Sequence, residues 1–409
     1  MKRLMLIMSV FSVLIVTSNK GLGGDLLLNL GPEELVQADG NDIVVPGYSV
    51  PSFVDWNNDN LKDLVIGEGG GSGDAKVRVY INVGTEPNPQ FSDYFYAQSW
   101  VDDLTCPASG CMGLFPRMVY WDDDTRKDLL VGQADGTVRI FRNIGSEESP
   151  RFDEGLFIQA GQPGLRANID VGKRATPTIV DWDNDGKTDL VVGGLDGMIR
   201  IYLNCGCSGA AHPSFTTSRP SGTPVQANGQ DLVVYGGRSS PVILDLDGDD
   251  KKDILTGNTN GQLLFYKNVG TDAEPNFSDY SLVKSDGIDI DLPDSPRSRP
   301  FVCFWTGDGY FGPIDAYPDV LIGAADGKVH LYRGIPTPGD IDGDGIVDFV
   351  DAALFAAQWL QTNCGQCDGA DLTDDERVDI DDLCRFIENW LIGLGYPLPN
   401  MLQNENPLE

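Results

Sequence analysis

Three loops of this chain carry oxygen-bearing side chains at alternate positions, a spacing that suits coordination of a metal ion. In the clearest loop, Asp181, Asp183, Asp185 and Asp189 follow this pattern, and Gly186 permits a turn with positive φ. The seventh residue adds its backbone carbonyl, giving a ligand set that suits Ca²⁺ better than the stricter octahedron of Mg²⁺. The predicted Ca²⁺ ligands are Asp55, Asn57, Asp59, Leu61 and Asp63; Asp181, Asp183, Asp185, Lys187 and Asp189; and Asp245, Asp247, Asp249, Lys251 and Asp253.

A simpler explanation competes with this one, because Asp, Asn and Gly also populate ordinary surface turns. Three copies at the same place in a repeat favour the metal site. Two further copies are degenerate. Tyr120 replaces the first ligand in one of them, and only Asp308 and Asp319 survive around an insertion in the other. We expect weak binding or none at these two loops.

Two longer acidic loops lie near the C-terminus. Each places ligands at positions 1, 3, 5, 7 and 12 of an EF-hand-like loop, with Asp at position 12 where Glu is usual. The second loop begins 31 residues after the first, and Trp390 follows Trp359 at the same interval. Apolar periodicity predicts a helix after each loop, over 352–360 and 383–391. The predicted Ca²⁺ ligands are Asp340, Asp342, Asp344, Ile346 and Asp351, then Asp371, Thr373, Asp375, Arg377 and Asp382.

The first three loops belong to an internal repeat that predicts the fold. The aligned residues 55, 120, 181, 245 and 304 are 65, 61, 64 and 59 residues apart, a period that suits one four-stranded propeller blade. The last unit lacks its fourth strand-like run, and a spare copy at 35–43 precedes the first unit. An N-terminal strand that completes the last blade would close the ring and remove exposed edges. We therefore predict a mainly β fold, a closed five-bladed propeller over 25–335, with an open or larger assembly as the alternative.

Four tryptophans share one position in this repeat, namely Trp56, Trp121, Trp182 and Trp305. They could form a ring of aromatic platforms for sugars, or they could pack between neighbouring blades. Large aromatic side chains dominate buried contacts, so we favour packing.

The first residues of the chain indicate export from the cell. Lys2 and Arg3 precede an apolar run over 4–16, which is shorter than the roughly 20 residues that span a bilayer. We predict a signal peptide over 1–22, a secreted or cell-surface location, and no membrane-spanning segment. Further along the chain we expect a linker over 336–339, a calcium-binding helical domain over 340–392, and a tail over 393–409.

The composition limits the possible partners. Among 409 residues, 62 are acidic and 29 basic, which gives a net charge of −33. Nucleic acid and anionic membranes would repel such a chain, so we exclude them as partners. Eight cysteines suit an oxidising compartment, where Cys106 and Cys111 could close a short loop. Zinc is an alternative use of Cys364 and Cys367, although no second cysteine pair has zinc-site spacing.

The repeat resembles the FG-GAP or VCBS repeat of integrin-like propellers and many secreted bacterial proteins. The loops of the form Asp-x-Asp/Asn-x-Asp-Gly-x-x-Asp-Leu carry this resemblance, which covers residues 25 to about 335. It implies that the loops bind Ca²⁺ and rigidify the blades, and that any chemistry comes from elsewhere.

The C-terminal repeat resembles a type I dockerin, because two loops, two helices and the apolar positions recur together. This resemblance implies docking to a cohesin module on a scaffold protein, ordered first by Ca²⁺. Thr373 and Glu376 depart from the pattern and weaken the second loop. Loop positions 10 and 11, which commonly set cohesin choice, are Phe349-Val350 and Ile380-Asp381 rather than Ser-Thr. A calcium-stabilised helical cap without a partner is the simpler alternative.

These features together predict a monomeric, non-catalytic binding or adhesion protein. We expect its propeller to recognise a glycan or an extracellular protein, and its tail to dock to a cohesin-type partner. The only histidines, His212 and His330, have no neighbours that suggest a nucleophile or base. Abundant carboxylates keep one alternative open, a lyase or glycosidase that degrades polysaccharide as part of an extracellular assembly.

Overall fold

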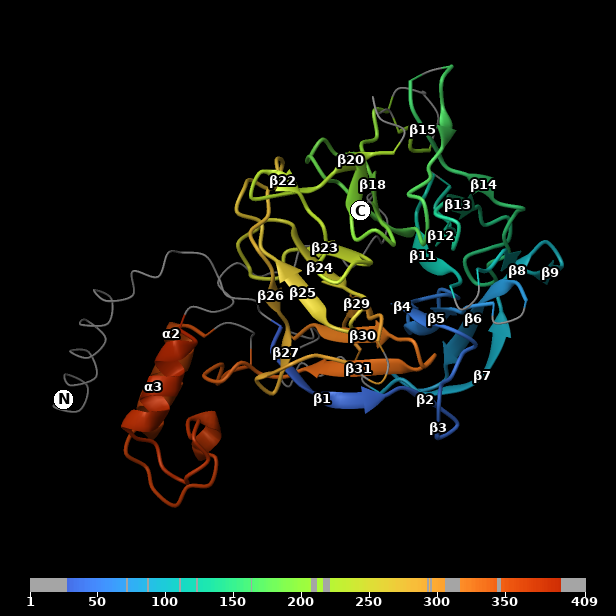
Figure 1. The fold of residues 1–409 in the computed structure, drawn as a ribbon. Helices are drawn as coiled ribbons and strands as arrows, with labels where there is room; N and C mark the ends of the chain where they lie inside the picture. Colours follow the sequence, from blue (N-terminus) through green and yellow to red (C-terminus); the bar gives the residue numbers. More distant parts are fainter. Residues whose placement is uncertain are drawn as a thin grey trace.

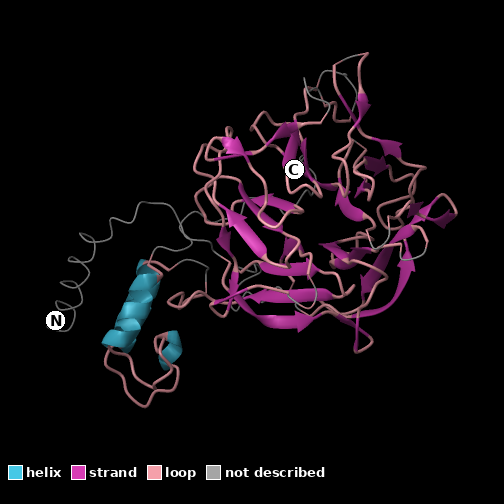
Figure 2. Ribbon diagram, viewed as in Figure 1, coloured by secondary structure: helices cyan, strands magenta, loops and turns pink. Residues whose placement is uncertain are grey.

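The structure, a computed structural model, describes residues 28–390 apart from 71–72, 87, 110–111, 123, 163, 207–211, 216–220, 293, 295, 306–316 and 344–346. The predicted signal peptide and tail lie outside the described residues, as do Asp308, Asp344 and Ile346. Within the described part the fold is mainly β, in a propeller-like arrangement of sheets, and helices occur near the C-terminal end (Figure 2).

The large sheets each contain four antiparallel strands in meander order, and they are arranged around a common centre (Figure 1). Their strands are β4 (Val50–Val54), β5 (Asp63–Gly67), β6 (Ala75–Asn82) and β7 (Phe91–Tyr96); β11 (Phe115–Val119), β12 (Asp128–Gly132), β13 (Val138–Phe141) and β14 (Leu156–Phe157); β17 (Thr176–Val180), β18 (Asp189–Gly193), β19 (Ile199–Tyr202) and β20 (Thr223–Pro224); β23 (Pro241–Leu244), β24 (Asp253–Gly257), β25 (Leu263–Tyr266) and β26 (Ser281–Leu282); and β29 (Arg299–Cys303), β30 (Asp319–Gly323), β31 (Val329–Gly334) and β1 (Leu30–Leu35).

The last of these sheets takes its fourth strand from the other end of the chain. β1 pairs antiparallel with β31, with Glu33 opposite Tyr332 and Leu35 opposite His330. The strand that completes the last sheet is therefore β1, and it ends where the predicted run, 35–43, begins. Residues 37–42 instead form a hairpin, because Asp39 and Gly40 adopt φ of 48° and 73° and turn the chain sharply.

Small hairpins follow the fourth strands and connect each sheet to its neighbour. In the last one, Ser285 pairs in parallel with Leu30 of β1, and in the first one Ala38 pairs with Phe91 of β7. The hairpin strands are β2 (Gln37–Ala38) and β3 (Asn41–Asp42), β8 (Gln98–Ser99) and β9 (Asp102–Asp103), β15 (Gln159–Ala160) and β16 (Ala167–Asn168), β21 (Gln226–Ala227) and β22 (Gln230–Asp231), and β27 (Lys284–Ser285) and β28 (Ile288–Asp289). A separate short strand, β10 (Thr105–Cys106), pairs with β6.

The hydrophobic core lies between the sheets rather than within one central mass. Each apolar cluster joins two successive sheets, and one of them joins the last sheet to the first through residues such as Leu321 and Leu64. The innermost strands also contact one another in sequence, since β4 touches both β11 and β29. Apolar burial therefore fixes each sheet against its neighbours.

The four aligned tryptophans pack between sheets, as the sequence predicted. All are buried, with exposed fractions of 3–6%. Trp182 lies 6.1 Å from Phe277, a residue of the next sheet unit, and Trp305 lies 5.7 Å from Phe91 in the same way. Such buried rings offer no platform to a sugar.

The C-terminal helices begin earlier than predicted. α2 (Phe349–Gln358) and α3 (Ile380–Glu388) each start three residues before the expected position, with the 3₁₀ helix η1 (Cys367–Gly369) between them. Asp348 and Asp379 cap the two helices, and each is paired in a capping box with the Asp three residues later. The cap recruits the end of each acidic loop into the first helical turn.

Cysteines and apolar helices give two further observations. Cys364 and Cys367 form a disulfide, so these two cysteines do not form a zinc site. Cys106 has a free, buried thiol, while its predicted partner Cys111 lies outside the described residues. In the described range, no helix has the length and apolarity needed to cross a membrane.

Candidate metal centres

Four of the five predicted loops gather three carboxylates at one point. In each of these groups, one oxygen from every side chain lies within 4.8 Å of the others. The groups are Asp181, Asp183 and Asp189; Asp245, Asp247 and Asp253; Asp340, Asp342 and Asp351; and Asp371, Asp375 and Asp382. Like charges at this separation repel strongly in a partly buried site, so a cation that neutralises them would stabilise the loops.

The loops curl through a common backbone pattern. In the loops that begin at Asp55, Asp181, Asp245 and Asp371, the fourth and sixth residues adopt left-handed conformations, as in Asn184 and Gly186 with φ of 58° and 80°. The first Asp then accepts hydrogen bonds from the backbone of the fifth and sixth residues, shown by Asp181 with the N–H groups of Asp185 and Gly186 at 3.1 and 2.9 Å. Asp371 makes the same contacts with Asp375 and Glu376 at 3.2 and 2.7 Å. This geometry turns successive side-chain oxygens toward one centre.

An unpartnered carboxylate oxygen supports a cation in the third-repeat loop. Asp183 Oδ1 is buried and has no hydrogen-bond partner, although it belongs to the gathered group. A buried acceptor without a donor is costly, and a bound cation would satisfy it. The oxygen ligands and the curled backbone therefore fit Ca²⁺.

The first-repeat loop differs from the other four. Asp55, Asp59 and Asp63 are not among the gathered carboxylate groups of the described residues. Instead, Asn57 Nδ2 donates a hydrogen bond to Asp59 Oδ2 at 2.9 Å, so the two predicted ligands partner each other. Asn60 still adopts a φ of 68° at the turn.

The remaining predicted ligands lie in the loops but outside the gathered groups. Leu61, Lys187 and Lys251 are half-buried at the seventh position, where their role would come from the backbone carbonyl. Asp185 pairs with Lys187, and Asp249 pairs with Lys251 at 2.9 Å. In the C-terminal loops, Thr373 donates its hydroxyl to Asp382 at 2.9 Å, and Arg377 is exposed.

The last aspartate of each propeller-type loop has a structural role that the sequence analysis missed. One carboxylate oxygen accepts a hydrogen bond from the backbone just after the first strand, and the other accepts one from the end of the third strand. The N–H donors are Trp56 and Asn82 to Asp63, Trp182 and Asn204 to Asp189, and Leu246 and Asn268 to Asp253, at 2.6–3.1 Å. These aspartates therefore connect three strands whether or not a metal is bound.

The sequence of the two degenerate loops already indicated this structural role of the last aspartate. Asp128 and Asp319 survive in the second and fifth repeats, where Tyr120 and Phe304 replace the first ligand. Asp128 accepts from Asn143 at 2.6 Å, and Asp319 accepts from Trp305 and Gly334 at 2.5 and 2.7 Å. Retention of the last aspartate in loops that have lost the first ligand indicates that this residue has a function in the fold. In the second loop, Arg126 pairs with Asp124, which further disfavours a metal there.

Burial changes the ionisation of these closing carboxyls. Loss of hydration raises the pKa of Asp63 and Asp128 to about 7, of Asp189 to about 6 and of Asp253 to about 8. Backbone hydrogen bonds lower each value in part, while neighbouring carboxylates raise it further. A divalent cation would reverse this effect by favouring the ionised form.

A lysine lies against the fourth-repeat centre. Lys267 Nζ forms ion pairs with Asp247 and with Asp249, the latter at 3.3 Å. The aligned residue in the third repeat is Leu203, which has no charge. The ammonium group therefore competes with a metal ion for two predicted ligands.

Replacing this lysine should strengthen metal binding at the fourth-repeat loop. We expect Lys267→Leu to raise the Ca²⁺ affinity of this loop about tenfold. Without the two partly buried ion pairs, both carboxylates are available to the metal, which improves the binding free energy by about 1.4 kcal/mol. Calcium-dependent hydrogen exchange of peptides covering 245–253 measures this site separately. Lys251→Leu, which removes a more exposed pair, should change the affinity about twofold or less. Equal affinities for wild type and Lys267→Leu would contradict the prediction.

Comparison with known proteins agrees with the repeat geometry. Residues 181–256 match the FG-GAP-like repeat family. This FG-GAP-like repeat begins at the first ligand of the third loop and ends in β24, so it contains both loops whose carboxylates gather within the sheets. Together with the propeller-like arrangement, it supports an FG-GAP repeat β-propeller.

Other comparisons add less. No curated protein matches the chain. Solved structures that are similar to it include BBS1N in complex with ARL6DN, in crystals soaked with lead or mercury. Sequence identity is 10% and 11%, the TM-scores are 0.35 and 0.34, and each alignment covers 76% of this chain and 98% of the other. TM-scores this low do not establish a shared fold.

Proposed function

We propose that this chain is a secreted calcium-binding protein that binds other molecules and catalyses no reaction. Its sheets form a closed five-bladed propeller that recognises a glycan or a protein. Its C-terminal helical module, residues 340–392, is dockerin-like and docks to a cohesin-type partner. Ca²⁺ occupies the acidic loops of both parts.

The observation that carries this proposal is the internal twofold repetition of the helical module. Asp351 accepts hydrogen bonds from the backbone of Ile341 and Asp342 at 2.6 and 3.1 Å, and Asp382 accepts from Leu372 and Thr373 at 2.9 and 3.0 Å. Phe355 and Phe386, which are also 31 residues apart, are both buried, with ring centroids 5.1 Å apart. Two matching halves thus share one small core.

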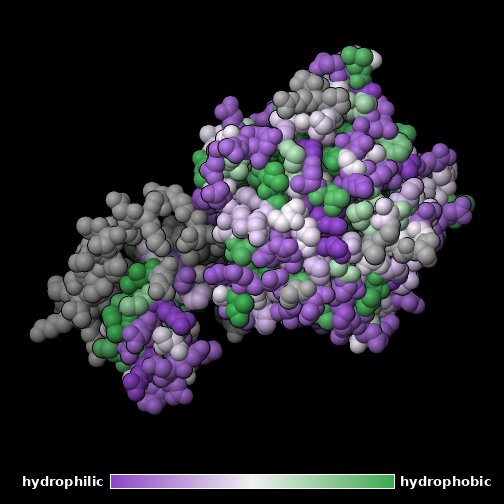
Figure 3. All heavy atoms as spheres, viewed as in Figure 1, coloured by the Kyte–Doolittle hydropathy of each residue, from purple (hydrophilic) through white to green (hydrophobic). Residues whose placement is uncertain are grey.

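The surface of the module favours a protein partner. Phe349, Val350 and Ile380 are apolar yet have exposed fractions of 68%, 52% and 58%. They occupy loop positions 10 and 11 in the two halves. Hydrophobic residues are also visible on this module beside hydrophilic ones in Figure 3. Exposed apolar side chains grouped at matching positions are typical of an interaction site.

Ring closure and export have separate support. The contacts among inner strands run from β4 through β11, β17, β23 and β29 back to β4, as five blades around one axis require. The disulfide between Cys364 and Cys367 suits an oxidising compartment. Extracellular modules commonly bind Ca²⁺ with dissociation constants of about 10⁻⁴ to 10⁻³ M, and we expect affinities in this range for a secreted protein.

Docking can be tested with the full-length protein and a panel of purified cohesin modules. We expect Ca²⁺-dependent binding that EGTA abolishes. The variant Phe349→Ala/Ile380→Ala should weaken binding at least about 30-fold, because buried anchors commonly contribute 2 kcal/mol or more. Both halves are changed because either could face the partner.

The matched control is Leu360→Ala, which removes an apolar side chain that is 55% exposed but lies outside the acidic loops. It should bind as wild type does. Absence of binding to every cohesin with Ca²⁺ present would remove the docking role, and the module would then be a calcium-stabilised cap.

A further inference from the structure

Four arginines gather at one end of the axis around which the sheets are arranged. Arg174, Arg238 and Arg297 occupy the same repeat position, three residues before the proline that opens each apolar run. Arg299 is the first residue of β29. All four lie at the start of inner strands, whereas the acidic loops follow the ends of these strands. The arginines and the metal centres of the third- and fourth-repeat loops therefore lie on opposite faces of the sheet ring.

Two aromatic rings hold the guanidinium groups together. The Arg299 guanidinium lies 4.5 Å from the Tyr48 ring and 6.0 Å from the Phe115 ring. Arg297 and Arg238 lie 4.9 and 5.9 Å from Tyr48, and Arg174 lies 5.0 Å from Phe115. We call this group of four arginines with Tyr48 and Phe115 the axial arginine cluster. Its members come from all five repeats, and none of them is a carboxylate.

The cluster has donors without acceptors. Five guanidinium nitrogens are buried and lack a hydrogen-bond partner. They are Arg174 Nε, Arg238 Nη1, Arg297 Nε, Arg299 Nε and Arg299 Nη2. Arg174 and Arg299 are each only 1% exposed, so solvent does not readily satisfy them. Buried charged donors are normally paired, and leaving them unpaired is costly.

No carboxylate in the described part of the chain compensates these charges. Among the described residues, the ion pairs of the chain include none of the four arginines. The hydrogen bonds they make go to neutral oxygens, such as Ser239 O and Ser240 Oγ from Arg174 at 2.9 and 2.8 Å. Burial, followed by repulsion from the other arginines, lowers the pKa of Arg299 to about 9 and also lowers that of Arg174. The cluster is positively charged, whereas the chain as a whole has a net charge of −33.

The backbone also holds these residues in an uncommon conformation. Arg174, Arg238 and Arg297 adopt φ of 58°, 59° and 75°, the left-handed region that favours glycine. Residues kept in such conformations concentrate where ligands bind. The same uncommon conformation therefore recurs at one position in three repeats, and we interpret this recurrence as a sign of a ligand site at the axis.

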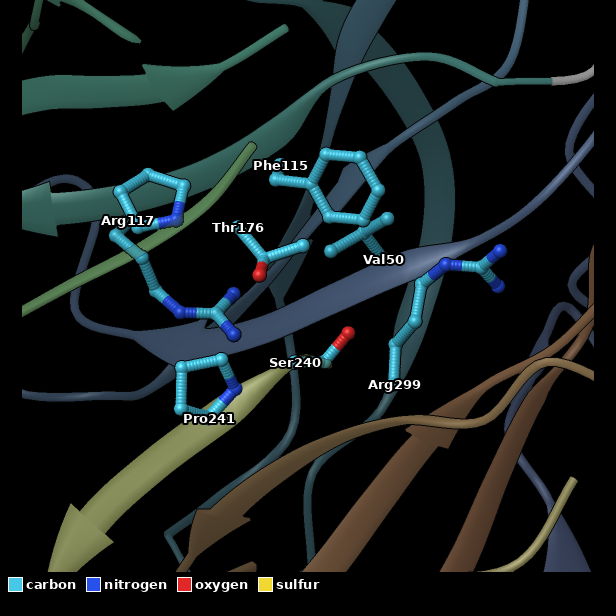
Figure 4. Close-up of a pocket in the computed structure, with 8 residues that line it drawn as sticks. Val50, Phe115, Arg117, Thr176, Ser240, Pro241 and Arg299 are labelled. Atoms are coloured by element: carbon cyan, nitrogen blue, oxygen red, sulfur yellow. The ribbon is translucent and has the colours of Figure 1, made fainter. Parts of the chain in front are cut away.

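A neighbouring arginine shows the contrast. Arg117 also reaches the axis, but it donates to Ser52 Oγ at 2.9 Å and to the carbonyls of Pro51 and Pro116 at 3.3 and 3.0 Å. Figure 4 shows its guanidinium beside Thr176 and Pro241 at a small cavity, whereas the Arg299 guanidinium points away from it. Arg117 is therefore a satisfied structural residue. Of the seven buried guanidinium nitrogens without a partner among the described residues, five belong to the axial arginine cluster.

We propose that the axial arginine cluster binds a single oxyanion group, such as a carboxylate or a sulfate. Planar guanidinium groups present paired N–H donors that match such oxygens, and they bind them best where water is excluded. The strongly negative surroundings disfavour a polyanion, so we infer a small anion or one acidic group of a larger ligand. This inference does not depend on docking or on Ca²⁺ binding.

The test measures the melting temperature of the full-length, Ca²⁺-saturated protein at constant ionic strength. Sodium sulfate and sodium glucuronate are titrated separately against sodium chloride. We expect a saturable rise in melting temperature with either oxyanion. A neutral sugar, glucose, should give no rise. A response to glucuronate but not sulfate would identify a carboxylate site, and equal responses would identify a general oxyanion site.

The matched variant is Arg238→Gln/Arg297→Gln, which changes the two half-buried members of the cluster. Without oxyanion it should be at least as stable as wild type, because repulsion is relieved, and its oxyanion affinity should fall at least tenfold. Arg238→Lys, which keeps the charge but loses the paired donors, is the second variant and should also weaken binding. Arg333→Gln, which removes an arginine paired with Glu34, is the control and should respond as wild type does. The proposal is overturned if the oxyanions do not change the melting temperature, or if they raise it equally in wild type and in all variants.

Discussion

Removing Ca²⁺ from the full-length protein should unfold the C-terminal helices while the sheets remain folded. The helical module has a core of few residues, and domains this small usually need metal or disulfide support. Its two gathered carboxylate groups repel internally without a cation. At a Ca²⁺ concentration 100 times the dissociation constant, each site contributes about 2.7 kcal/mol. Two sites then supply about 5 kcal/mol, as much as such a core can provide alone.

Hydrogen exchange with mass spectrometry can measure this effect in the intact chain. Amides of α2 and α3 should lose about 100-fold or more of their protection when EGTA is added, whereas β5, β18 and β24 should stay protected. Asp351→Asn should reproduce the loss in α2 with Ca²⁺ present, because it removes a ligand that also caps the helix. Asp374→Asn is the matched control, since Asp374 is exposed and outside the gathered group. Unchanged protection after chelation would contradict the role of Ca²⁺.

The stability of the sheets should change with pH in opposite directions with and without Ca²⁺. Asp189 and Asp253 have folded-state pKa values raised to about 6 and about 8 from an ordinary value near 4. A raised value means that the folded state binds protons more tightly than the unfolded state. The stabilisation is complete below pH about 4 and is lost as the pH rises through 6 to 8. Without metal, the melting temperature should therefore fall over this range.

With Ca²⁺ the same carboxyls must ionise to bind the metal, so binding strengthens as the pH rises. Two occupied sheet loops at 100 times the dissociation constant contribute about 5 kcal/mol. At about 2 °C per kcal/mol for a domain of this size, Ca²⁺ should raise the melting temperature by about 10 °C at pH 8. At pH 5 the increase should be much smaller.

Asp128 provides the control for this experiment. Burial raises its pKa to about 7, yet its loop has no gathered carboxylate group among the described residues. Asp128→Asn should reduce the pH dependence seen in EGTA and leave the effect of Ca²⁺ unchanged. Asp253→Asn should reduce both. If the melting temperature in EGTA rose between pH 6 and 8, the raised pKa values would be wrong.

Much of the candidate site could be predicted from the sequence, because the ligand pattern is local. Alternate oxygens and a left-handed turn determine how a nine-residue loop curls, so Asp181 and Asp183 meet for reasons contained in their own segment. The first-repeat loop shows where this reasoning ends. Asn57 has the correct position, but its amide group can donate as well as accept, and it bonds to Asp59 instead.

The role of the closing aspartates depended on longer-range contacts, whereas the helix starts depended on capping boxes between residues three apart. Capping by Asp348 moved the start of α2 into the acidic loop, which an apolar period cannot reveal. Asp63 reaches Asn82 at the far end of the third strand, and only strand pairing brings these residues together.

By itself, the sequence determined the repeat, the position of every acidic loop and the mainly β fold, because each depends on residues close together in the chain. Only the tertiary structure revealed the axial arginine cluster. Arg174, Arg238 and Arg297 are about 60 residues apart and look like ordinary surface charges in the sequence. They become neighbours because the inner strands converge on one axis, where burial removes the water that would otherwise separate their charges.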